Sequence, residues 1–205
     1  MQELWRLKLD WNDYFPIQLE SQWKRFVTFL STINTLNFPR YILLDYALKI
    51  ELHGFADTSE KSYGEAIYVS CLNNSGEISE HFVCSKSRIT PLNSVTIPRL
   101  ELCAAVLLAK LAQKTITSMK ISFHSIVLWS DSTIALAWIQ MDPSVLKPFV
   151  RNRVSAIQKL TEINAWKHVP SQENPIDIIS RGSIQKKSKI VICGGLVRRS
   201  YKIIQ

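Results

Sequence analysis

The segment from Pro98 to Lys114 constrains the fold more than any other part of this 205-residue chain. It contains the run Leu-Cys-Ala-Ala-Val-Leu-Leu-Ala, with a proline at its start, where proline favours the first turn of a helix. A helix that is apolar almost all round has to be buried on most of its circumference. Other elements of the chain must therefore cover it.

Three strand-like segments precede this helix. Apolar and β-branched residues predict strands at about 49–57, 63–72 and 78–86, joined by short connections. The second connection, Asn73-Asn74-Ser75-Gly76, is typical of a hairpin turn. Strands joined this tightly are antiparallel.

Further elements follow the apolar helix. The pattern predicts a strand at 125–129, helices at 132–139 and 149–162, a last strand at 165–169 and a last helix at 174–180. This order predicts an α/β fold, a mixed five-stranded sheet with helices packed on it.

Residues 1–48 read as a separate segment. A proline at position 16 opens a stretch in which apolar side chains recur at three- and four-residue steps, at Leu19, Trp23, Phe26, Leu30 and Ile33. This spacing predicts an amphipathic helix. Because so short a segment cannot build its own core, we expect its apolar face to pack on the main domain or on a neighbouring protein domain.

Four acidic residues interrupt or end apolar runs: Asp57, Glu101, Asp131 and Asp177. A carboxylate is costly to hold in apolar surroundings unless a cation or hydrogen-bond donors compensate it. Converging carboxylates suit Mg²⁺ or Mn²⁺, and two such ions about 3.5–4 Å apart can drive phosphodiester hydrolysis. Taken singly, each aspartate could instead be a turn or helix-capping residue.

The charge of the chain agrees with a polyanionic partner. Its 25 lysines and arginines exceed its 17 acidic residues, so the formal net charge is +8. Ordinary solubility charge is the alternative explanation. The four cysteines form no C-x-x-C pair, which predicts reduced thiols.

No apolar run approaches the roughly 20 residues of a membrane span, and the N-terminus lacks the apolar core of a signal peptide. We therefore expect an intracellular protein that does not enter a membrane.

Taken together, these motifs resemble the ribonuclease H domain of BEL/Pao-class LTR retrotransposon polyproteins. The resemblance runs from about residue 52 to residue 182. It is carried by His-Gly-Phe-Ala-Asp at 53–57, Ser-Lys-Ser-Arg-Ile at 85–89, Thr-Ile-Pro-Arg-Leu-Glu-Leu at 96–102, Trp-Ser-Asp-Ser-Thr at 129–133, Phe-Val-Arg-Asn-Arg-Val at 149–154 and Asn-Pro-Ile-Asp at 174–177.

The resemblance implies a ribonuclease H-like fold and cleavage of the RNA strand of RNA/DNA hybrids during reverse transcription. It assigns the metal-binding and catalytic roles, with two Mg²⁺ or Mn²⁺ ions, to Asp57, Glu101, Asp131 and Asp177. Near the scissile strand we expect Ser85, Arg88, Thr96 and Arg99, with Ser132 beside the metals.

The resemblance also implies an organisation in three parts. Residues 1–48 are expected to be a helical connecting segment on the reverse transcriptase side, 49–182 the ribonuclease H-like domain, and 183–205 a basic tail that is disordered or degenerate. The partners are the hybrid and the reverse transcriptase domain of the parent polyprotein. The expected location is the cytoplasm, retrotransposon particles or the nucleus.

Two residues depart from the family pattern. Glu65 stands where a small residue is usual, and its carboxylate should either face solvent or disturb the fold. His168 lies on the expected last strand rather than in a loop before the fourth acid, which favours a structural histidine over a proton shuttle. The alternative function, favoured by Glu65 and by the unusual tail after residue 182, is a catalytically inactive remnant that acts as a nucleic-acid-binding or structural domain. The presence of all four acids favours the enzyme.

Overall fold

The structure is a computed structural model that describes residues 7–8, 10, 12–14, 16–30, 41–91 and 95–176. The chain divides into two compact units, Met1–Phe38 and Pro39–Gln205, which are described separately. The predicted division at residues 48 and 182 stays a prediction, and the predicted basic tail at 183–205 lies outside the described residues.

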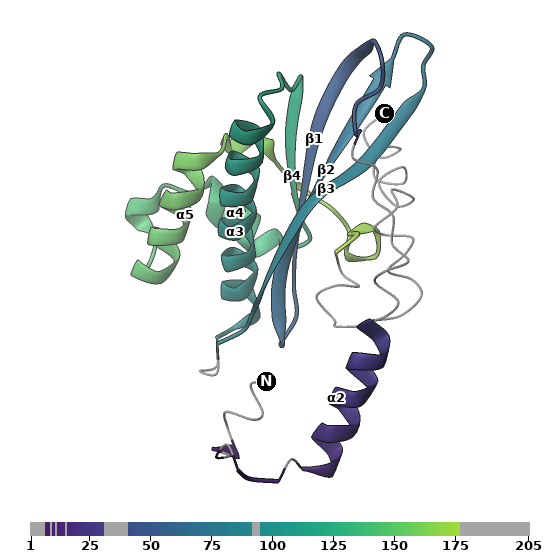
Figure 1. Cartoon of the computed structure of the whole chain (residues 1–205). Coiled ribbons are helices and arrows are strands. Elements are labelled where there is room, and N and C mark those ends of the chain that lie inside the picture. The colour runs from purple at the N-terminus through teal and green to yellow at the C-terminus, as the bar shows by residue number, and fades with distance from the viewer. Residues whose placement is uncertain are drawn as a thin grey trace. The chain divides into compact units, whose positions relative to one another are not determined.

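A mixed sheet forms the centre of the second unit (Figure 1). It has five strands in the order β3-β2-β1-β4-β5. Strands β1, β2 and β3 are antiparallel neighbours, whereas β4 runs parallel to both β1 and β5. This arrangement confirms the predicted α/β fold. The strands are β1 (Ala47–Thr58), β2 (Ser62–Asn73), β3 (Ile78–Ile89), β4 (Ser125–Ser130) and β5 (Trp166–His168).

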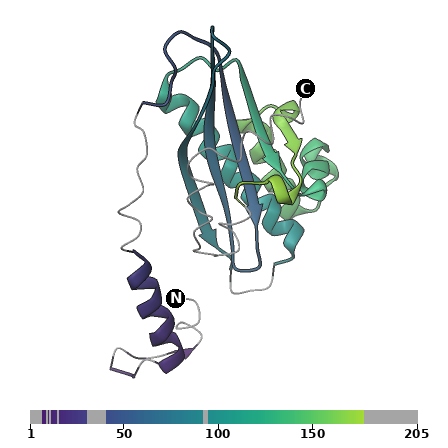
Figure 2. The ribbon, with the colours of Figure 1, turned by 90° about the vertical axis from the view of Figure 1, so that its right-hand side faces the viewer.

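Three helices gather on one face of this sheet (Figure 1): α3 (Ile97–Met119), α4 (Thr133–Gln140) and α5 (Pro148–Leu160). Short 3-10 turns lie between α4 and α5 at Pro143–Val145, between α5 and β5 at Ile163–Ala165, and after β5 at Ser171–Glu173. The chain after β5 then crosses to the opposite face of the sheet (Figure 2), where Val169 and Ile176 join a second core cluster.

Helix α3 is the central core element, as its composition predicted. Its buried residues are Leu100, Leu102, Ala104, Ala105, Leu107, Leu108, Ala109, Ala112 and Thr115. Glycine at position 54 of β1 permits this packing, because a Cβ there would lie 2.7 Å from Leu108 Cδ1. Contrary to the expectation that no run is long enough, α3 alone among the described helices is long and apolar enough to cross a membrane. Its apolar residues pack against the sheet and α5 instead.

The second core cluster lies on the other face of the sheet. Its buried members are Phe55, Ala66, Tyr68, Trp129, Val169 and Ile176. The ring of Phe55 meets Tyr68 edge-on at 5.8 Å and stacks on Trp129 at 6.2 Å between centroids. The sheet is thus covered by apolar side chains on both faces where β1 and β4 meet.

Most element boundaries differ from the sequence-based ones by one to three residues, and the helix ends show the clearest differences. Helix α3 continues to Met119 and ends where Lys120 takes up a left-handed conformation with φ 53°. Helix α5 stops at Leu160, because Thr161 is extended. The helix expected at 174–180 is wrong for residues 174–176, which are not helical; the rest of that range lies outside the described residues.

The first unit contains the predicted amphipathic helix, α2 (Ile17–Leu30). Lys24 forms an ion pair with Glu20 one turn earlier, at 2.6 Å. Trp23 and Phe26 are 54% and 40% exposed, and their ring centroids lie 5.6 Å apart. What covers this apolar side stays a prediction.

Candidate active site

The ends of β1 and β4 place two of the predicted acids side by side. The parallel ladder pairs residues 51–56 of β1 with 125–130 of β4, and its last pair is Ala56 with Ser130. Asp57 is the next residue of β1, and Asp131 follows directly after the end of β4. Neighbouring strands lie about 4.7–4.9 Å apart, and ligand sites of open α/β sheets collect at the carboxyl ends of strands.

Asp57 is almost completely buried, with 4% of its surface exposed. It pairs with Gly64 of β2 and points to the face of the sheet opposite α3, since side chains alternate along a strand and that of Ala56 belongs to the α3 core. A buried carboxylate requires compensating donors or a cation.

Glu101, in the second turn of α3, reaches the residues that follow β4. Its Oε2 accepts a short hydrogen bond from the Ser132 hydroxyl. Ser132 is the N-cap of α4 and also accepts from the amide of Ala135 at 3.0 Å, so its hydroxyl is fixed in place. Burial raises the pKa of Glu101, the Ser132 hydrogen bond lowers it, and the charge of Asp131 raises it again. The carboxylates of Glu101 and Asp131 are thus close enough to repel each other.

The chain after β5 forms hydrogen bonds with the ends of both β1 and β4. The Ser171 hydroxyl donates to Asp131 Oδ2 at 2.8 Å, and buried Asn174 donates from Nδ2 to the carbonyl of Ala56 at 2.9 Å. Asn174 Oδ1 also accepts from the Ile176 amide at 3.2 Å. Neither Ser171 nor Asn174 was predicted as a site residue, although the Asn-Pro pair before an acid was a usable signal. Asp177 lies outside the described residues.

The donor chemistry of this region fits a hard divalent cation. Carboxylate oxygens of Asp57, Glu101 and Asp131 are the ligands that Mg²⁺ prefers. The expected close cluster of these three is not formed, however: within 41–91 and 95–176, no three His, Cys, Asp or Glu side chains come together tightly enough to enclose an ion. Of these acids, Glu101 and Asp131 interact, since the charge of Asp131 raises the pKa of Glu101.

The predicted substrate residues fall into two groups. Thr96 and Arg99 are exposed at the start of α3, next to Glu101 in sequence, and the Thr96 side chain makes no capping bond to that helix. Ser85 and Arg88 are exposed on the edge strand β3, which is two strands, or about 10 Å, from β1. The first group therefore lies at the start of the helix that carries Glu101, and the second on an edge strand.

An aromatic contact brings in Phe149, which the sequence-based prediction missed as a site residue. The Arg153 guanidinium carbon lies 3.5 Å from the Phe149 ring centroid, and that of Arg99 lies 5.1 Å from the same ring. Arg153 Nε also donates to Cys103 Sγ at 3.2 Å. Two cations thus share one ring beside the start of α3. The Arg151 guanidinium instead donates hydrogen bonds to the backbone carbonyls of residues 143, 144 and 146.

Glu65 does not face solvent, which corrects the first of the two alternatives expected from sequence. It is 2% exposed on β2, and neither carboxylate oxygen has a hydrogen-bond partner among the described residues. Burial raises the pKa of Glu65 to about 8, although the charges of Lys86 and Arg88 on β3 lower it. The side chain shares a face with Ala56, so the core tolerates it chiefly in the protonated form.

The sequence matches one family model, described as Pao retrotransposon-like RNaseH-like domain, over residues 1–132. The chain belongs to this family. A search of curated proteins finds no match.

Solved structures similar to this chain include several RNase H domains. LC11-RNase H1 in complex with an RNA/DNA hybrid has 15% sequence identity and a TM-score of 0.39, covering 62% of this chain and 88% of that chain. The N-terminal RNase H domain of Rv2228c from Mycobacterium tuberculosis, solved as a fusion with maltose binding protein, has 9% identity and a TM-score of 0.41, covering 69% and 96%. Prototype foamy virus protease-reverse transcriptase has 12% identity and a TM-score of 0.36, covering 75% and 22%.

Proposed function

We propose that this Pao-type RNase H-like domain is a metal-dependent endoribonuclease that cleaves the RNA strand of RNA/DNA hybrids during retrotransposon reverse transcription. The observation that carries the proposal is the parallel register that sets Asp57 beside Asp131, with Glu101 brought to Asp131 through Ser132. Family membership supports it, because the matched region includes these three acids.

The residues proposed to hold two Mg²⁺ or Mn²⁺ ions are Asp57, Glu101, Asp131 and Asp177. Ions bound there would activate a water molecule and stabilise the leaving oxygen of the phosphodiester. The chain's own residues prepare the ligands. Ser132 orients the Glu101 carboxylate, Ser171 orients that of Asp131, and Asn174 ties the following chain to the residue before Asp57.

Substrate contacts are proposed for Thr96 and Arg99 beside Glu101, for Ser85 and Arg88 on β3, and for Ser132. A hybrid is read through backbone phosphates and 2′-hydroxyl groups rather than base edges, which hydroxyl and guanidinium side chains can contact. The net charge of +8 supports binding of such a polyanion.

The proposal extends to the context of the domain. We infer that the parent polyprotein supplies a reverse transcriptase domain as partner, that residues 1–48 connect to it, and that the protein acts in the cytoplasm, in retrotransposon particles or in the nucleus. Subcellular fractionation that recovers the protein with reverse transcriptase activity would test this placement.

The test of the function is cleavage of an RNA/DNA hybrid labelled on the RNA strand, with Mg²⁺ and with Mn²⁺. We expect cleavage of the RNA strand only, with no cutting of duplex DNA or of the DNA strand. Cleavage by Glu101→Gln should be lost. Cutting of duplex DNA, or equal rates for the parent and Glu101→Gln, would show that the assignment is wrong.

One observation favours the second candidate, an inactive remnant that binds nucleic acid or serves as a structural domain. No three acids enclose a metal-sized space among the described residues. This candidate predicts that the hybrid binds with salt-dependent affinity but is not cut in either metal. The same assay therefore separates the two functions.

A further inference from the structure

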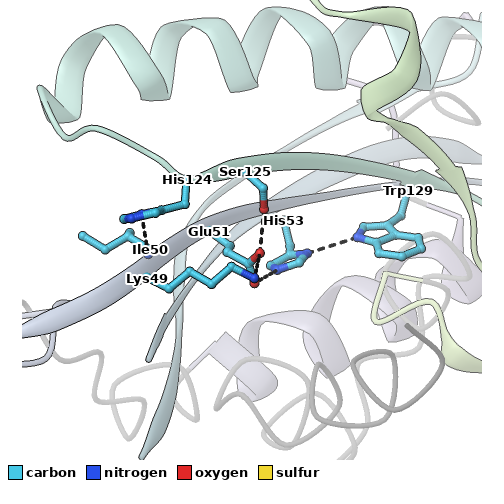
Figure 3. Close-up of polar contacts among 7 residues, drawn as sticks. All are labelled: Lys49, Ile50, Glu51, His53, His124, Ser125 and Trp129. Atoms are coloured by element: carbon cyan, nitrogen blue, oxygen red, sulfur yellow. Dashed lines mark hydrogen bonds and ion pairs between the residues drawn. The ribbon is translucent and has the colours of Figure 1, made fainter. Parts of the chain in front are cut away.

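A column of polar and aromatic side chains lies beneath the two aspartates, on the face of the sheet opposite α3. Alternate residues of a strand share a face, so Glu51, His53 and Phe55 of β1 lie in line with Asp57. Trp129 of β4 lies on the same face and belongs to the same core cluster as Phe55. Figure 3 shows Lys49, Glu51 and His53 meeting Ser125 and Trp129 across the two strands.

A buried hydrogen bond joins the two strands within this column. The Trp129 indole Nε1 donates to His53 Nδ1 at 3.3 Å (Figure 3), and the two residues are 6% and 3% exposed. An indole can only donate, so Nδ1 of His53 has to be the acceptor. A neutral imidazole that accepts at Nδ1 carries its proton at Nε2.

Glu51 favours this same tautomer. Its Oε2 lies 3.9 Å from His53 Nε2, while Oε1 accepts from the Ser125 hydroxyl at 2.6 Å and pairs with Lys49 Nζ at 2.9 Å. The pKa of Glu51 is lowered to about 2, first by the interaction with His53 and then by Ser125 and Lys49, against the opposing effect of burial. The carboxylate is thus ionised at neutral pH and attracts a proton on Nε2.

The hydrogen bond between Trp129 and His53 lies a few residues before the candidate metal ligands on both strands. Trp129 precedes Asp131 by two residues, and Phe55, whose ring stacks on Trp129 at 6.2 Å, precedes Asp57 by two. The backbone ladder between the strands ends at Ala56 and Ser130, so both aspartates lie beyond its last pair. Asp57 stays paired with Gly64 of β2, but no backbone pair joins it to Asp131, so side-chain contacts between β1 and β4 help to set the separation of these two strand ends.

We propose that His53 is a positioning residue: by accepting the Trp129 hydrogen bond it fixes the indole between β1 and β4, and so holds Asp57 and Asp131 at the spacing that a shared divalent cation requires. This inference rests on the proposed function. His53 acts through Trp129 and contacts neither substrate nor metal.

The first test uses metal-free protein and no catalysis. Nitrogen-15 NMR of the histidine rings should show His53 with an unprotonated Nδ1 and a protonated Nε2, and the Trp129 indole proton should exchange slowly. In His53→Leu, exchange of this proton should accelerate and the backbone amide signals of Asp57 and Asp131 should shift. A proton on Nδ1, or unmoved signals at both aspartates, would overturn the inference whether or not the protein is a nuclease.

The second test compares variants by the Mg²⁺ concentration that gives half-maximal hybrid cleavage. Loss of an outer partner of a metal ligand typically costs 10- to 100-fold, and we expect about this increase in His53→Leu and in Trp129→Phe, which lacks the N–H. In His53→Asn the side-chain oxygen can accept in place of Nδ1, so the metal requirement should stay within about threefold of the parent. The double variant His53→Leu/Trp129→Phe should be no worse than either single one.

Trp166→Phe is the matched control. It also removes a buried indole N–H, the one that donates to Thr161 Oγ1 at 3.0 Å, but it lies on β5. We expect it to lower stability without changing the Mg²⁺ requirement. Equal effects of His53→Leu and His53→Asn, or additive effects in the double variant, would contradict the positioning role. A parent that cuts no hybrid would refute the proposed function instead, and the NMR test would still decide the inference.

Discussion

Asp57 and Asp131 follow the last paired residues of the parallel strands β1 and β4, so the register of the sheet places their charges near each other. Ligands of a divalent cation matter chiefly through that charge. We expect Asp57→Asn and Asp131→Asn to reduce hybrid cleavage by more than about 100-fold while the hybrid still binds. Without metal, Asp131→Asn should be at least as stable as the parent, because the substitution removes the Asp131 charge that repels Glu101. Turnover on a labelled hybrid, together with urea unfolding, checks both statements; a cleaving Asp57→Asn would contradict the metal-ligand role.

Glu65 gives a stability prediction that is independent of catalysis. Its pKa rises from 4.5 in the unfolded chain to about 8 in the fold, so the folded state binds the proton more tightly. The stabilisation from protonation is complete below about pH 4.5 and is lost as the pH rises through about 8. The free energy of unfolding of the parent should fall over this range by a few kcal/mol, since each pKa unit corresponds to about 1.4 kcal/mol.

Glu65→Gln should flatten this pH dependence, because the amide cannot ionise. Urea unfolding at about pH 5 and about pH 9 measures the difference. Glu162→Gln, at an exposed glutamate, is the control and should leave the pH dependence of the parent unchanged. Equal stabilities of parent and Glu65→Gln at the higher pH would mean that Glu65 finds a partner once ionised.

At the scale of elements, local sequence patterns predicted those helices and turns whose conformation depends on their own residues. The apolar run after Pro98 predicted α3, and the turn at Asn73-Asn74-Ser75-Gly76 predicted the β2–β3 hairpin. The helix expected from residue 174 failed because Asn174 bonds to the carbonyl of Ala56, 118 residues earlier. No local spacing could indicate that contact. For the same reason the pattern placed Asp57 at a strand end but could not show that Ser132 fixes Glu101.

The Asn174 contact can be tested as an attachment of one element to another. Asn174→Ala leaves the buried carbonyl of Ala56 without this donor, which costs about 1–3 kcal/mol of unfolding free energy. Because the same segment places Ser171 on Asp131, we also expect hybrid cleavage to fall by about 10-fold or more. Urea unfolding and cleavage rates measure the two effects. Asn164→Ala, at an exposed asparagine, should change neither by a comparable amount.

For the whole molecule, composition indicated a polyanionic partner but gave no location for it. The net charge of +8 is spread along the sequence. The fold brings Arg99 of α3 and Arg153 of α5 to the same ring of Phe149, beside the helix turn that carries Glu101. Arg151, although near in sequence, is engaged with backbone carbonyls. Charge counting treats these arginines alike, whereas the structure separates their roles.

If Arg99 contacts a phosphate of the hybrid, its loss should change how binding responds to salt. Each phosphate contact contributes a slope of about −0.7 to −0.9 to the logarithm of affinity against the logarithm of salt concentration. We expect Arg99→Ala to make the slope shallower by this amount and to weaken binding equally for hybrids of different sequence. Lys114→Ala removes one exposed charge from the same helix, four turns away, and should leave the slope unchanged. If both variants lower the affinity equally, only net charge matters; if the slope differs for Arg99→Ala alone, the phosphate contact lies at the start of α3, next to Glu101.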